Sequence, residues 1–269
     1  MSRLLPTARL ASLMKAVVSM AAVFALSSCG EIEPEPPVDE DGEPIELPEP
    51  YDRWLEIVEI SPAPGELALE PSIAVRFNDY IEDDSFRSYA FGALSSGGVV
   101  ARGDADYVMT DKTVVWRPWR PLEPGLRYTF QTTGAVESAT GSPFLQPAEW
   151  PAYVASRDQE PTSSTALPDA RWDDVAPIFE GKCAECHRNP QAGLNPLTYE
   201  SLQNAESQQT DLYLVRPADP ADSYLMRKLL WDYADIEFVH QPPAWAGGEQ
   251  LSREELLLIE GWIAGGARR

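Results

Sequence analysis

The stretch Ile73-Ala-Val-Arg-Phe77 alternates large apolar side chains with small or charged ones. A period of two predicts a β-strand with one buried and one exposed face. Comparable runs lie at Leu55–Ile60, Val114–Trp116 and Tyr128–Thr132, and segments rich in Pro and Gly separate them. Short strands punctuated in this way are typical of a small sandwich. The sequence therefore predicts a β-sandwich over residues 54–156.

Residues 170–269 show the period of α-helices instead. Apolar side chains recur every three or four positions within Trp172–Gly181, and again within Asp222–Asp232. Pro177 has no N–H group, so the first of these helices is expected to begin late or to be kinked. Residues 157–169 form a linker of Pro, Ser and Thr. The predicted fold class is multidomain, β followed by all-α.

A third helix is predicted near the end of the chain. Ser252 and Glu255 have the spacing of a capping box, in which each side chain pairs with the other residue's backbone N–H. Leu256–Ile263 then presents an apolar face, and Gly265 and Gly266 predict its end.

The N-terminus predicts export. Arg3, Arg9 and Lys15 precede an apolar run, Ala16–Leu26, which is too short to span a membrane. Leu26-Ser-Ser-Cys29 resembles the lipobox of bacterial lipoproteins. The resemblance implies that residues 1–28 are removed and that Cys29 carries a lipid thioether. An ordinary secretory signal is the alternative.

Residues 29–53 predict an extended tether, because acids and prolines dominate them. Gly30 stands where an Asp would resemble an inner-membrane retention signal, so we expect a lipid anchor in the outer membrane, on either its periplasmic or its surface face. The formal charge of the whole chain is -22. A surface this acidic argues against a nucleic-acid partner.

The chain has three cysteines, and two of them lie in Cys183-Ala-Glu-Cys186-His187. Two thiols at this spacing, followed at once by His, form the attachment motif of a c-type haem. We expect one covalent haem c, with thioethers at Cys183 and Cys186 and iron ligation by His187. A zinc site that includes His240 and a thioredoxin-like thiol pair are weaker readings, because adjacent ligands rarely close a tetrahedron and no βαβ pattern surrounds the motif.

The first block resembles bacterial Ig-like domains. The matching stretches are Ser61–Gly65, Ile73–Phe77, Pro121–Tyr128 and Val136–Gly141. The resemblance implies an Ig-like β-sandwich that acts as a spacer, an adhesion module or a surface binding module.

The second block resembles class I c-type cytochrome domains from Trp172 to Ala267. The resemblance rests on the haem motif and its preceding helix, on Val215–Leu225, and on the last helix ending Gly261–Ala267. It implies a cytochrome c-like haem domain whose first and last helices cross.

The sixth iron ligand departs from the family's Met-Pro-Pro turn, since the matching stretch reads His240-Gln-Pro-Pro243. His240 is the favoured ligand, Met226 is less favoured, and an open site is the third possibility. A second protein ligand implies electron transfer with an unidentified redox protein partner, so that the chain is more an electron carrier than an enzyme. An open site would instead allow a haem peroxidase or a gas or redox sensor, with Arg216 or Arg227 as the cation.

Overall fold

The computed structural model describes residues 54–82, 85, 90–132, 136–161, 166–188, 197–203, 205–233, 240–243 and 250–269. The predicted signal and tether, residues 1–28 and 29–53, lie outside this range, and so does the proposed lipid site at Cys29. We call residues 54–156 the sandwich block and residues 170–269 the helical block.

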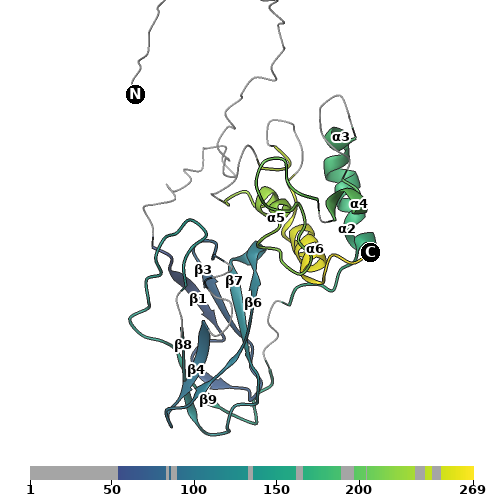
Figure 1. Cartoon of the computed structure of the whole chain (residues 1–269). Helices are drawn as coiled ribbons and strands as arrows, with labels where there is room; N and C mark the ends of the chain where they lie inside the picture. Colours follow the sequence, from purple (N-terminus) through teal and green to yellow (C-terminus); the bar gives the residue numbers. More distant parts are fainter. Residues whose placement is uncertain are drawn as a thin grey trace, which may run out of the picture. The chain divides into compact units, whose positions relative to one another are not determined.

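The sandwich block contains two sheets (Figure 1). The first has the order β1 (Ile57–Ser61), β3 (Ile73–Phe77), β7 (Thr113–Pro118) and β6 (Gly103–Val108), with antiparallel neighbours. The second has the order β2 (Gly65–Leu67), β9 (Ala152–Ala155), β8 (Arg127–Thr132), β4 (Phe91–Ser95) and β5 (Val100–Ala101). Its β2 and β9 are parallel, and its other neighbours are antiparallel. The predicted β architecture is confirmed.

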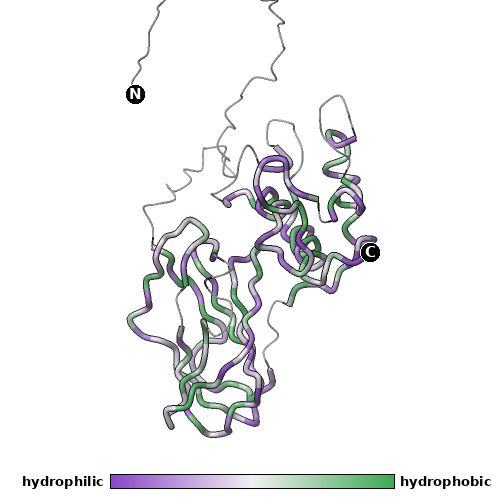
Figure 2. The backbone as a smooth tube through the Cα atoms, viewed as in Figure 1, coloured by the Kyte–Doolittle hydropathy of each residue, from purple (hydrophilic) through white to green (hydrophobic). Residues whose placement is uncertain are grey.

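Alternation along the strands builds the core of this block. Ile73, Val75 and Phe77 of β3 are buried, whereas the residues between them face outward. Aromatic rings join the two sheets: Phe77 contacts Phe91 with ring centroids 6.4 Å apart, and Trp116 contacts Phe130 at 5.5 Å. Figure 2 shows apolar and polar stretches interspersed along the backbone of this block.

The helical block is made of short helices joined by loops. In chain order they are α2 (Trp172–Ile178), the π-helical turn η2 (Phe179–Cys183), α3 (Ala184–His187), α4 (Tyr199–Leu202), α5 (Tyr224–Leu229) and α6 (Arg253–Ala264). Of those described, only α6, with 12 residues, exceeds seven. The structure therefore supports a few helices beside an Ig-like sandwich and gives no support to the finer prediction of an all-α cytochrome domain.

The first helix begins at Trp172, so a late start is wrong. The Arg171 N–H donates to the Asp174 carboxylate at 2.8 Å, and the Trp172 N–H donates to the Arg268 carbonyl at 2.9 Å. Both bonds satisfy donors that a helix start leaves open. Pro177 lies inside α2, and the backbone widens into η2 at Phe179, directly after it.

The predicted capping box of α6 is confirmed. Ser252 Oγ accepts from the Glu255 N–H at 3.2 Å, and the Glu255 carboxylate accepts from the Ser252 N–H at 2.7 Å. Trp262 of α6 is fully buried and packs on the Trp172 ring of α2, with centroids 5.4 Å apart.

The two blocks share one hydrophobic cluster of buried residues, with Trp116 from the sandwich block and Trp262 from the helical block among its members. Polar contacts also join them, since Lys112 pairs with Asp232 and Arg253 pairs with Asp111. Within the ranges given above, no helix is long and apolar enough to cross a membrane.

Candidate functional site

A groove of about 700 Å³ opens along the outer face of β1 and β3. We call it the sheet groove. Its lining is mostly polar and comes from three places. The first sheet and the residue after β3 give Glu59, Ser61, Ala74, Arg76 and Asn78; the turn before β7 and the first residue of β7 give Thr110–Thr113; and the helical block gives Asp232 and Arg253. The alternation in the sequence predicted which β3 side chains face outward. It contained no signal that Asp232 and Arg253 of the helical block would also line the groove.

Charged side chains of the sheet groove neutralise one another. Arg76 pairs with Glu59 at 2.8 Å, and Arg253 makes a two-pronged contact with Asp111. The Lys112 ammonium lies 2.5 Å from Asp232. Because each of these cations has an anion beside it, the groove offers hydrogen-bonding groups rather than a field of one sign.

Asp232 stands at the junction of the groove and the helical block. Burial alone would raise the pKa of its carboxyl, but hydrogen bonds from Lys112 and Tyr80, together with the Lys112 charge, hold that pKa below its ordinary value. The Tyr80 hydroxyl donates to the same carboxylate, and burial followed by the Asp232 charge raises the Tyr80 pKa well above its usual range. This carboxylate is therefore ionised near neutral pH and fixed by two donors.

The thiol motif lies where η2 gives way to α3. Cys183 closes η2 and is partly buried, whereas Cys186 is exposed on α3, and both thiols are free. Burial, with smaller contributions from Cys186 and Glu255, raises the pKa of Cys183 to about 11. His187 ends the same short helix and is partly buried. The structure thus presents the motif on the surface side of the helical block.

His240 follows α5 in the chain and is partly buried. Its ring stacks on Trp231 with centroids 5.7 Å apart, and its buried Nδ1 atom has no hydrogen-bond partner within the described part of the chain. Burial lowers the pKa of His240, and the Lys228 charge lowers it further, against smaller opposing contributions from the Lys228 backbone and Asp232. A neutral imidazole has one ring nitrogen with a free lone pair, which could accept a hydrogen bond or bind a metal ion.

The less favoured iron ligand, Met226, is fully buried in α5. It belongs to the hydrophobic cluster that also holds Leu229 and Ile259. Core packing accounts for its position.

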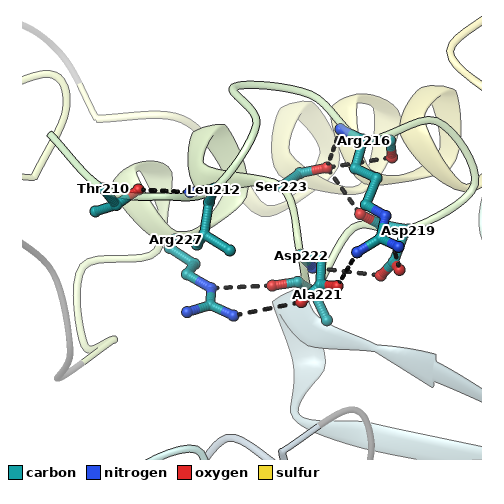
Figure 3. A network of polar contacts seen from close by, with 8 residues as sticks. All are labelled: Thr210, Leu212, Arg216, Asp219, Ala221, Asp222, Ser223 and Arg227. Atoms are coloured by element: carbon teal, nitrogen blue, oxygen red, sulfur yellow. Dashed lines mark hydrogen bonds and ion pairs between the residues drawn. The ribbon is translucent and has the colours of Figure 1, made fainter. Parts of the chain in front are cut away.

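A polar network fixes the loop before α5 (Figure 3). Ser223 is fully buried; its hydroxyl accepts from the Arg216 N–H at 2.8 Å and donates to the Asp219 carbonyl at 2.7 Å. Both arginine side chains point to Asp222, and Arg227 also donates to the Ala221 carbonyl at 2.9 Å. The guanidinium groups of Arg216 and Arg227, which an open-site peroxidase would use as its cation, are thus engaged within their own loop.

Comparison with protein families gives a match in the sandwich block. The model of the bacterial Ig-like domain matches residues 52–152. No curated protein matches the chain.

Solved structures give only distant likenesses. The S-layer protein rSbsC(31-844) shares 14% identity at a TM-score of 0.32, and the alignment covers 44% of this chain and 16% of that one. L,D-transpeptidase LdtMt1 in complex with imipenem shares 15% at 0.28, over 39% and 41% of the two chains. L,D-transpeptidase 3 from Mycobacterium tuberculosis shares 14% at 0.26, over 38% and 37%. The chain therefore spans less than half the length of these proteins, and likenesses at such scores carry no functional argument.

Two findings correct the description of the chain as a metal-binding cytochrome with haem iron. In the described part of the chain no group of three or more His, Cys, Asp or Glu side chains is placed to hold a metal ion. The matching family model also ends at residue 152, before the thiol motif. The labels cytochrome, haem iron and electron transfer therefore have no support in the described part of the chain and are withdrawn as a description of the protein. Covalent attachment of haem c at Cys183 and Cys186 is tested by neither finding and stays a prediction. The family likeness that stands is that of residues 52–152 to bacterial Ig-like domains.

Proposed function

We propose that the chain is a binding module of the bacterial cell envelope and that its sandwich block carries the recognition surface. The observation that carries this proposal is the match of residues 52–152 to the bacterial Ig-like domain. The predicted signal, Cys29 and the acidic tether support the envelope location, because together they would hold the folded part away from a membrane.

The sheet groove is the proposed recognition site. It combines backbone edges, hydroxyls and three ion pairs along one face of the first sheet. Since its charges are already balanced within the protein, hydrogen bonding rather than net charge would hold a ligand there. This chemistry favours a neutral, polar ligand such as a polysaccharide over a polyanion.

Filling the groove tests the proposal. Ala74 lies on the outward face of β3 within the groove lining, so Ala74→Trp would occupy the groove without removing an ion pair. The matched control is Val154→Trp on β9, where Val154 is 40% exposed and lies outside the groove lining. We expect the chain to bind isolated envelope polysaccharide, Ala74→Trp to abolish that binding, and Val154→Trp to preserve it. Equal binding by both variants, or none by the unaltered chain, would refute the groove as the site.

We propose separately that Cys183 and Cys186 carry a covalent haem c. The support is the motif itself: thioether formation needs two thiols that are not in a disulfide, and both thiols are free, although Cys183 is partly buried. His187 would be the proximal ligand, and His240, with its unpaired Nδ1, the second. A bound haem would supply a redox-active centre. A pyridine haemochrome spectrum of the exported chain tests the attachment, and a colourless chain would rule it out.

A further inference from the structure

Glu260 of α6 is a fully buried carboxylate that contacts the sandwich block. It meets the 3-10 turn η1 (Met109–Asp111), which joins β6 to β7. Its carboxylate accepts from the Met109 N–H at 2.5 Å, from the Thr110 N–H at 3.0 Å and from the Thr110 hydroxyl at 2.6 Å. Three donors from one turn thus converge on a single side chain that is distant in sequence.

The charged and titratable groups around this contact come from both blocks. Asp111 lies on the same turn, and its charge opposes ionisation of Glu260. Arg253 is the first residue of α6, and its guanidinium group neutralises the Asp111 charge through two hydrogen bonds. Tyr107 at the end of β6 is buried, and burial raises its pKa well above the usual range, with the Glu260 charge adding to that effect. No cation faces the Glu260 carboxylate in the contacts that the structure gives.

We propose that Glu260 is a proton-controlled latch that fastens the helical block to the sandwich block. The geometry carries the inference, because a carboxyl in this position must either keep a buried charge on three donors or take up a proton. Glutamate in solvent has neither constraint.

The direction of the pH effect follows from proton linkage. Burial raises the pKa of Glu260 from 4.5 to about 6, against the opposing hydrogen bonds from Thr110 and Met109. We call the state docked when Glu260 holds the η1 turn, and undocked when this contact is open and Glu260 has its ordinary pKa. Because its pKa is higher, Glu260 binds the proton more tightly in the docked state than in the undocked state. Docking is weakest above pH 6 and strengthens as the pH falls from 6 towards 4.5. The two pKa values predict a change of roughly eightfold in the docking equilibrium between pH 7 and pH 5.

Two other groups with shifted pKa values, Asp232 and His240, depend on pH differently from Glu260. The pKa of Asp232 is lowered from 3.8, so its contact with Lys112 weakens only as the pH falls below that value. The pKa of His240 is lowered from 6.5, so its contribution is present at high pH and is lost as the pH falls below 6.5. Because His240 opposes Glu260 in overall stability measurements, the test must be local to the latch.

Hydrogen exchange at the Met109 and Thr110 amides provides that local measurement. In the full chain, after correction for intrinsic exchange rates, we expect protection of both amides to be roughly eightfold greater at pH 5 than at pH 7. Glu260→Gln keeps an acceptor but cannot ionise, so this dependence should vanish. Glu254→Gln is the matched control, since Glu254 is exposed on the same helix and should leave the dependence intact.

Thr110→Val keeps the proposal testable if Glu260→Gln does not fold. It removes one hydrogen bond that favours the ionised carboxylate, so it should move the transition to higher pH. Equal protection at pH 5 and pH 7 in the unaltered chain would overturn the latch. So would a transition that Thr110→Val leaves unchanged or a pH dependence that survives Glu260→Gln.

Discussion

The sandwich block and the helical block differ in what holds them together. Paired strands and one alternating pattern define the sandwich block, and the bacterial Ig-like domain model matches residues 52–152. The helical block uses short helices whose ends and loops depend on individual polar contacts, such as those of Ser223 and Ser252. A repeated pattern tolerates the change of single residues, whereas a structure that depends on individual contacts is sensitive to the loss of any one of them.

The largest expected effect is the loss of the proposed covalent haem from the helical block, since the sandwich block has no corresponding motif. We expect Cys183→Ala combined with Cys186→Ala to abolish covalent haem completely, because both thioether positions are lost. The measurement is the pyridine haemochrome spectrum together with the intact mass. Cys29→Ser serves as a control that should keep the haem and lose only the proposed lipid. Haem that survives acid–acetone extraction of the double variant would contradict the attachment sites.

The shared core gives the next largest effect. Trp116 in the sandwich block and Trp262 in the helical block are both fully buried in one hydrophobic cluster. Either substitution to Ala should reduce the free energy of unfolding by about 3–5 kcal/mol. We expect one cooperative transition in each variant, monitored by circular dichroism during denaturation. Two separate transitions in Trp262→Ala would mean that the blocks are independent.

A glycine in α6 tests how closely the chain segments approach. Alanine normally stabilises a helix interior relative to glycine by about 1 kcal/mol. At Gly261, however, an added Cβ would lie 2.2 Å from the Pro168 carbonyl oxygen, so Gly261→Ala should cost about 1–3 kcal/mol. Gly181 in η2 is the matched control, because an added Cβ there meets nothing within 4 Å. Gly181→Ala should be neutral or stabilising in the same denaturation experiment, and an equal loss in both variants would contradict the close approach at Gly261.

The smallest expected effect is at the start of α6. Ser252→Ala removes the acceptor for the Glu255 N–H and should cost about 1 kcal/mol. Thermal denaturation measures this loss, and Ser252→Asp should restore most of it, since Asp is also a good cap. No loss in Ser252→Ala would show that tertiary packing of Trp262 alone fixes the helix.

Local rules in the sequence predicted much of the fold. The alternation in Ile73–Phe77 became β3, and the spacing of Ser252 and Glu255 became a capping box. Pro177 left open a late start or a kink of the first helix. The late start is wrong, because partners from elsewhere in the chain, including the Arg268 carbonyl, complete the helix start at Trp172, and the backbone changes to η2 only after Pro177. The sheet groove could not be predicted, since Asp232 and Arg253 reach its wall through the tertiary fold.

The sequence by itself determined the strand and helix periods, the cap of α6 and the presence of a motif with two thiols and an imidazole, because each depends on residues a few positions apart. Only the tertiary structure decided that Glu260 is buried on donors from Met109, which lies 151 positions away. It alone brought Asp232 to Lys112 and gave Gly261 its close neighbour at Pro168. The physical reason is that burial and hydrogen-bond partnership of such groups are properties of the packed chain, and no local pattern encodes which distant segment will supply the partner.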